Sequence, residues 1–131
     1  WRLHAKGYAI RYIPDAVVRH VHSATSKEWS PTFVFHVDRN RLLMLTKNAT
    51  ADLAVREVLH YPLTTASMTV RAVRTVLAER RRPAVRPLLL RWRVIASYLR
   101  LLPDMLAKRH LVGRSATVSR RELQQWLVER R

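Results

Sequence analysis

The pattern of apolar and polar residues predicts a short β-rich segment followed by a longer helical part. Residues 1–6 are typical of the last turns of a helix, and residues 8–13 are rich in residue types that favour strands. A Pro-Asp pair at 14–15 predicts a turn or bulge, after which residues 16–20 continue extended. Residues 21–30 are mostly polar, which is typical of a loop. We therefore expect a short pair of strands and a loop before the long helices begin.

Three helical stretches follow. Residues 30–48 begin with Ser-Pro, in which the serine caps a helix and the proline occupies its first position. Residues 51–79 predict a second helix with a kink near Pro62, and the basic run at 79–83 is the expected linker. After Pro87, at ~100° per residue, apolar residues share one stripe of a third helix and arginines lie opposite. The stripe consists of Leu88, Trp92, Ile95, Leu99 and Leu102, and the arginines are Arg86, Arg93 and Arg100.

The charge of the chain indicates a polyanionic partner. In 131 residues, 25 lysines and arginines against 9 acidic residues give a formal net charge of +16. The chain has no cysteine, which excludes disulfides and thiolate metal sites. Its longest mostly apolar stretch, residues 58–70, is interrupted by polar residues and is shorter than the ~20 residues that span a bilayer. The charge therefore fits nucleic acid, an acidic lipid surface or a phosphorylated ligand, and no transmembrane helix is expected.

Two motifs in the first third of the chain resemble a known enzyme family. Residues 14–26 read Pro-Asp-Ala-Val-Val-Arg-His-Val-His-Ser-Ala-Thr-Ser, and residues 39–43 read Arg-Asn-Arg-Leu-Leu. In this order they resemble the end of the catalytic domain of family 2 glycosyltransferases, which have the GT-A fold. The initial Trp-Arg-Leu resembles the tail of that family's acidic-x-Asp-x-x-Trp-Arg segment. We therefore expect a fragment whose general base precedes Trp1 and which contains no catalytic residue itself.

The resemblance implies a metal site at two histidines. His20 best matches the histidine that often completes the coordination of Mg²⁺ or Mn²⁺ in the family, and His22 is the second choice. Because they are two residues apart, both side chains would point to one face of an extended strand. Two histidines without a third ligand are also compatible with a structural or incidental role. The family's Asp-x-Asp ligands do not occur in this chain, so the cation is expected only together with the missing N-terminal half.

The resemblance also implies a diphosphate site. Ser23, Thr25 and Ser26 match a small, hydroxylic loop of the family, in which backbone N–H groups approach phosphate oxygens closely. Arg39 is placed to hold the diphosphate, since a guanidinium fork suits phosphate well. The alternatives are a loop that is simply solvated, and an Arg39 that braces this loop with Asn40 through hydrogen bonds.

The first two residues match family positions near the acceptor sugar. Trp1 and Arg2 follow the place of the catalytic acid in the family, so the resemblance implies that they are close to the acceptor. A tryptophan at this position is equally compatible with a frayed aromatic residue of the core.

The basic helical part has three interpretations. As a surface-seeking helix, it would place its apolar stripe at the headgroup boundary and its arginines on anionic lipid. The membrane-facing residues would then be Leu88, Trp92, Ile95 and Leu99, with Arg86, Arg93 and Arg100. As a nucleic-acid arm it lacks the recognised signatures, so nucleic acid is the least favoured partner. The third interpretation is a helical hairpin packed on the catalytic domain with solvated arginines.

These observations predict an α+β fragment that is mostly α. Residues 1–49 would end a GT-A domain, and residues 50–131 would form a basic, membrane-associating extension. The intact enzyme would move a sugar, with inversion, from a nucleotide-sugar donor to a polyprenyl-linked or cell-surface polysaccharide acceptor. We expect it in the cytoplasm at the inner face of the cell membrane, and we expect the fragment alone to be inactive. The alternative is a non-catalytic basic module that binds anionic membrane or nucleic acid.

Overall fold

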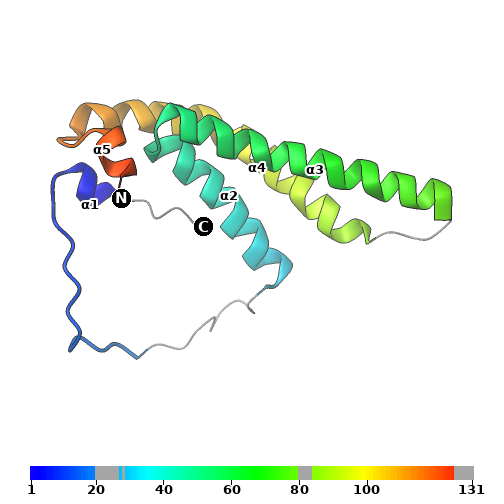
Figure 1. Cartoon of the computed structure of the whole chain (residues 1–131), viewed down its shortest axis with the longest axis horizontal. Coiled ribbons are helices and arrows are strands. Elements are labelled where there is room, and N and C mark those ends of the chain that lie inside the picture. Colours follow the sequence, from blue (N-terminus) through cyan, green and yellow to red (C-terminus); the bar gives the residue numbers. More distant parts are fainter. Residues whose placement is uncertain (20–26, 28, 80–83, 126–131) are drawn as a thin grey trace.

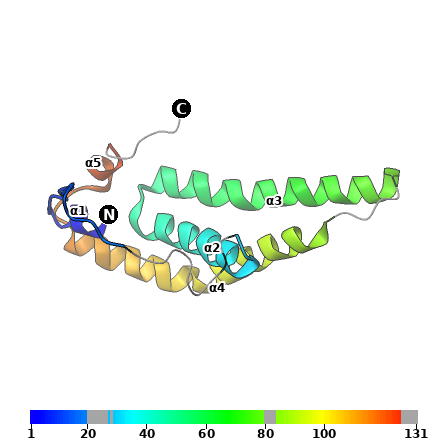
Figure 2. The same cartoon turned by 90° about the horizontal axis from the view of Figure 1, so that it is seen from below.

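The structure, a computed structural model, describes residues 1–19, 27, 29–79 and 84–125, and within these residues it is all α. Its helices are α1 (Arg2–Ala5), α2 (Pro31–Asn48), α3 (Ala51–Glu79), α4 (Val85–Ser115) and α5 (Arg120–Gln124). The two long helices α3 and α4 run antiparallel, and α2 lies against them (Figures 1 and 2). The end of α3 and the start of α4 extend beyond α2, so the hairpin has a packed half and a projecting half.

The predicted α+β fold, the end of a GT-A domain with a short pair of strands, is wrong for the described residues, which are all α. Residues 8–19 carry the β-forming side chains that suggested it, but they are exposed and contain no strand. The predicted turn is present, since the N–H of Ala16 donates to the carbonyl of Ile13 at 3.2 Å. A strand is stable only when a neighbouring strand satisfies its backbone groups, and the described residues offer no such neighbour. This part of the chain therefore has the residue types of a strand without the partner that a sheet requires.

The helix boundaries follow the predicted signals closely. Ser30 caps α2 through an Oγ that accepts from the N–H of Phe33 at 3.2 Å, and proline occupies the first position of the helix. Helix α3 contains Pro62 and runs to the expected linker. Helix α4 begins at Val85, before the predicted start after Pro87, and runs through Pro103 to Ser115. The predicted domain boundary at residue 49 falls between α2 and α3, which pack against each other.

Two small clusters form the core. In the first, Leu42, Tyr61, Val94 and Tyr98 are buried where α2, α3 and α4 meet. In the second, Leu45, Ala49 and Ala54 are buried at the turn between α2 and α3, and Trp1 packs against them. The core therefore lies at one end of the hairpin, and no element among the described residues covers much of α3.

The N-terminal helix is joined to the last one. The N–H groups of Thr117 and Val118 donate to the carbonyl of Ala5 at 2.9 and 3.3 Å, so the segment before α5 closes over the end of α1. The chain turns away from α1 at Gly7, whose φ of +79° is a conformation that side chains disfavour. Among the described helices, none combines the length and apolarity that a membrane crossing requires.

Candidate functional site

Arg39, the predicted diphosphate residue, is anchored by its neighbours on α2. Its Nε and Nη2 atoms donate to Oδ1 of Asn40 at 3.2 and 3.0 Å, and Nη2 lies 3.1 Å from Nδ1 of His36. Its guanidinium carbon lies 5.2 Å from the centroid of the Phe35 ring. These contacts orient the guanidinium in advance, which lowers the entropy lost when it binds an anion.

A second arginine approaches the same phenyl ring from α4. The guanidinium carbon of Arg93 lies 5.8 Å from the ring centroid of Phe35. We call Phe35, His36, Arg39 and Arg93 the Phe35 cluster. Neither arginine is paired with a carboxylate within the described residues. The cluster thus contains Arg39, which was predicted to bind diphosphate, and Arg93, which was predicted to face the membrane. Together they form one positively charged surface.

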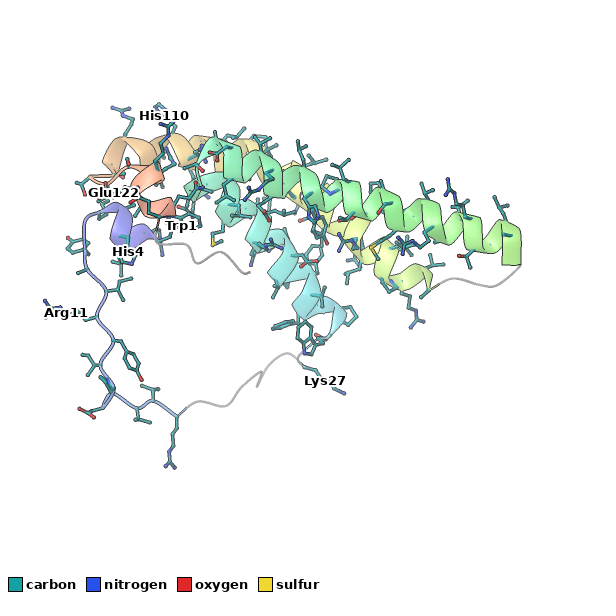
Figure 3. The ribbon with its side chains drawn as sticks, viewed as in Figure 1. Trp1, His4, Arg11, Lys27, His110 and Glu122 are labelled. Carbon is teal, nitrogen blue, oxygen red and sulfur yellow. The ribbon has the colours of Figure 1, made fainter. Side chains whose placement is uncertain are left out.

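The other predicted metal and diphosphate residues lie outside the described residues. These are His20, His22, Ser23, Thr25 and Ser26. In the part of the chain that the structure does describe, no three histidines or carboxylates are grouped as a metal site would require. Lys27 is exposed beside the first turn of α2, well away from Trp1 and His110, which lie at the end of the molecule that holds α1 and α5 (Figure 3). The metal site and the loop therefore stay predictions.

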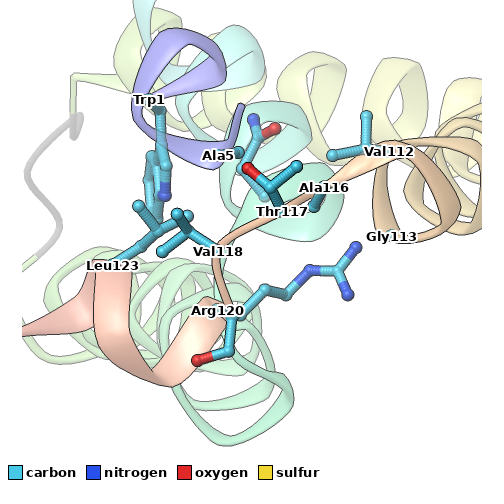
Figure 4. Close-up of a pocket in the computed structure, with 11 residues that line it drawn as sticks. Trp1, Ala5, Val112, Gly113, Ala116, Thr117, Val118, Arg120 and Leu123 are labelled. Atoms are coloured by element: carbon cyan, nitrogen blue, oxygen red, sulfur yellow. The ribbon is translucent and has the colours of Figure 1, made fainter. Parts of the chain in front are cut away.

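The two predicted acceptor-proximal residues differ in their surroundings. Trp1 is half-buried on the second core cluster and lines a cavity of about 290 Å³ with Val118 and Leu123 (Figure 4). Arg2 is exposed on α1. Trp1 therefore has a packing role in this structure, which is the alternative that its position in the sequence left open.

A polar network around Tyr61 joins the three long helices. The Tyr61 hydroxyl donates to Oδ2 of Asp38 at 2.7 Å, and the guanidinium of Arg91 lies 4.0 Å from the tyrosine ring centroid. Arg91 also donates to Oγ1 of Thr65 and of Thr64, each at 2.9 Å, and to the Tyr61 carbonyl at 3.3 Å. Burial, and then the bond to Asp38, raise the pKa of Tyr61. The network fixes α4 against α3 beside Pro62.

The predicted apolar stripe of α4 is divided between the core and the surface. Ile95 packs on the first core cluster and Leu88 is half-buried, whereas Trp92 and Leu99 are exposed. The most buried residues of α4, Val94 and Tyr98, lie beside the predicted stripe, because α2 packs there. Arg86, Arg93 and Arg100 are all exposed, as expected for solvated or lipid-facing arginines.

Helix α3 carries an exposed apolar row that we did not predict from the sequence. Six apolar residues, each more than half exposed, are separated by four, four, seven, three and four residues, so they fall on one side of the helix. This α3 row consists of Val55, Leu59, Leu63, Val70, Val73 and Leu77. Exposed basic side chains border it along one edge, namely Arg56, His60, Arg71 and Arg74.

The exposed apolar residues of α4 adjoin the α3 row. Trp92 donates from Nε1 to Oγ1 of Thr69 on α3 at 3.3 Å. At the other end, Leu106 of α4 and Val55 of α3 line the same largely apolar cavity of about 240 Å³. We call the α3 row together with Trp92, Leu99 and Leu106 the apolar face. An uncovered apolar surface that spans two helices is larger than the scattered apolar residues of an ordinary protein surface.

The signal for the apolar face was present in the spacing of the α3 residues. Pro62 and the surrounding threonines interrupt the stretch, so it does not stand out as an apolar run.

Comparisons of this chain with protein-family models, curated proteins and solved structures found no match.

Proposed function

We propose that this chain is a C-terminal part of a family 2-type glycosyltransferase, and that its helical hairpin holds the enzyme on an anionic membrane surface. The whole enzyme would transfer a sugar from a nucleotide-sugar donor to a polyprenyl-linked or polysaccharide acceptor. The observation that carries the membrane part of the proposal is the apolar face, with the arginines along its edge.

The chemistry of the apolar face favours a lipid surface. An interfacial helix places apolar side chains at the acyl boundary and basic side chains among the phosphates. The apolar side chains at the acyl boundary would be those of Leu63, Val70 and Leu77. The basic side chains among the phosphates would be those of Arg71 and Arg74. Tryptophan prefers the same interface, because its ring is apolar and its N–H is polar, and Trp92 is 44% exposed on this face. The net charge of +16 adds attraction to acidic lipid.

The Phe35 cluster supports the donor part of the proposal. Arg39 and Arg93 present two guanidinium groups near the start of α2, after the predicted loop, and neither pairs with a carboxylate of the described residues. A nucleotide diphosphate carries two adjacent anionic phosphates, and arginine binds phosphate oxygens through paired N–H donors. In this proposal the cluster would stabilise the charge of the leaving nucleotide, and His20 would be a ligand of the divalent cation.

The membrane proposal is tested by sedimentation with vesicles. Leu63→Glu with Leu77→Glu places two negative charges in the apolar face, and we expect it to abolish binding to phosphatidylglycerol vesicles. Val17→Glu with Val18→Glu is the matched control, since these valines are 78% and 83% exposed on the N-terminal segment. Equal binding by both double variants would contradict a membrane role and leave an upstream domain or a second copy of the chain as the occupant.

The transferase proposal is tested on the full-length protein with a panel of UDP-, GDP- and dTDP-linked sugars. We expect His20→Ala to remove most activity and Arg39→Gln to raise KM for the donor. The matched control is Arg41→Gln on the same helix, because Arg41 makes an exposed ion pair of 2.8 Å with Glu57. Full activity in both His20→Ala and Arg39→Gln would favour the alternative, a non-catalytic basic module. The sequence before Trp1 is a further check, because the proposal requires an acidic-x-Asp there.

A further inference from the structure

A second basic site lies near the end of α4, and it shares no residue with the Phe35 cluster. A cavity of about 480 Å³ opens between the last turns of α4 and the start of α5. Four of its six lining residues are basic in type and none is acidic. The lining consists of Leu106, Arg109, His110, Gly113, Arg114 and Arg120.

Two of the arginines are held in place by backbone carbonyls. Arg109 donates from Nη1 to the carbonyl of Thr46 at 2.6 Å, which ties it to α2. Arg120 donates from Nη2 to the carbonyl of Arg109 at 2.8 Å. The Arg120 guanidinium lies on Gly113, where a Cβ atom would be only 3.3 Å from Nη1 and Nη2 (Figure 4). The absence of a side chain at Gly113 therefore provides the space that Arg120 occupies.

The positive charge of this site is not neutralised within the described residues. The ion pairs found there join Arg41 and Arg56 to Glu57, and Lys108 to Asp104, so none reaches the cavity. The Nε atom of Arg120 is buried, and no group in the described part of the chain accepts a hydrogen bond from it. Burial, and then the charge of Arg120, lower the pKa of Arg109. Two like charges held side by side destabilise each other, and an anion between them would relieve this repulsion.

We propose that this cavity binds a phosphate group through Arg109 and Arg120, with His110 and Arg114 at its rim. Guanidinium groups fixed by carbonyl contacts are suited to phosphate, because their N–H donors match its oxygens in pairs. The phosphate is either that of a soluble phosphorylated ligand or that of a lipid headgroup. This site is separate from the proposed donor site, and its test requires no glycosyl transfer.

The test measures the affinity of the chain for inorganic pyrophosphate by calorimetry, and for vesicles containing phosphatidic acid by sedimentation. We expect Arg120→Gln to weaken binding about tenfold or more, because a hydrogen bond to a charged group is lost. The matched control is Arg11→Gln, which removes the same charge from an exposed position of the N-terminal segment, outside the cavity. Loss of binding confined to pyrophosphate would identify a soluble ligand, and loss confined to vesicles would identify a lipid headgroup. Equal effects of Arg120→Gln and Arg11→Gln would overturn the site.

Gly113→Ala separates binding from folding. The added Cβ requires the Arg120 guanidinium to move by a few tenths of an ångström, keeps every charge and suits the helix. We expect this variant to fold as well as the original chain and to bind pyrophosphate or phosphatidic acid more weakly. Unchanged affinity for both probes in a folded Gly113→Ala variant, together with unchanged affinity in Arg120→Gln, would rule the proposal out.

Discussion

The hydroxyl groups of Tyr98 on α4 and Thr46 on α2 lie 2.9 Å apart in the core, although the two residues are 52 positions apart in the sequence. Thr46 also donates from its Oγ1 to the carbonyl of Leu42 at 2.9 Å. Since both side chains are buried, this contact specifies how α4 is placed on α2.

We expect Tyr98→Phe to lower the free energy of unfolding by ~1 kcal/mol, which is typical of one internal hydrogen bond. The loss stays small because Thr46 keeps its bond to the Leu42 carbonyl. Urea denaturation measures it, with Tyr12→Phe as the control, since Tyr12 is 87% exposed. The same midpoint for both variants would show that the contact does not stabilise the helical body.

Arg91→Lys tests the network beside Pro62. Lysine carries the same charge, but its single ammonium cannot reach Thr64, Thr65 and the Tyr61 carbonyl with the geometry of a guanidinium. We therefore expect unfolding to become easier by ~1–2 kcal/mol. Arg86→Lys, at an exposed position of the same helix, is expected to change stability by less than ~0.5 kcal/mol. Equal stabilities would mean that charge alone accounts for the role of Arg91.

The raised pKa of Tyr61 predicts a loss of stability in alkali. Burial and the bond to Asp38 favour the neutral phenol in the folded chain, whereas the unfolded chain ionises at the ordinary pKa of ~10. The folded state therefore binds more protons above that pH, and its stability falls as pH rises. Below pH ~10 this contribution is fully present. Urea midpoints between pH 9 and 11 should decrease more steeply for the original chain than for Tyr61→Phe, and parallel curves would contradict the assignment.

The two glycines of the chain should respond differently to alanine. Gly7 has a φ of +79°, and a Cβ there would lie 3.1 Å from Oγ1 of Thr117, so we expect Gly7→Ala to cost ~1–2 kcal/mol. Gly113 lies inside α4, where alanine is a better helix former by up to ~1 kcal/mol, and its Cβ meets only the end of the Arg120 side chain. We expect Gly113→Ala to be neutral or stabilising. Thermal unfolding measures both, and the reverse order would contradict this account.

The helices could be predicted from the sequence because their signals are local. Ser30 and the proline after it are sufficient to place the start of α2, since the cap forms within one turn. The strand pair could not be judged this way, because residues 8–19 have strand-forming side chains but a strand also requires a partner. Local pattern therefore identified where helices form, and it was wrong where the structure depends on a neighbour.

The candidate sites depended more strongly on tertiary structure. The α4 stripe includes Ile95, which packs on the core, and Leu99, which is exposed, because α2 covers only one side of this helix. Arg109 and Arg120 are brought together by the turn before α5, which no helical periodicity indicates. The resemblance to glycosyltransferases concerns residues 1–3, 14–26 and 39–43, and the structure describes only part of the second of these segments.

The claim that the apolar face binds a membrane is tested most directly by measuring the depth of a nitroxide label in a phosphatidylglycerol bilayer. The chain has no cysteine, so Val70→Cys and Met68→Cys each provide a single labelling site. These residues are comparably exposed, at 51% and 42%, but lie ~160° apart around α3, with only Val70 in the apolar face. We predict that a label at position 70 becomes accessible to oxygen and protected from a water-soluble nickel chelate, whereas a label at 68 stays in water. Equal exposure of both labels to the chelate in the presence of vesicles would contradict the membrane role of the apolar face.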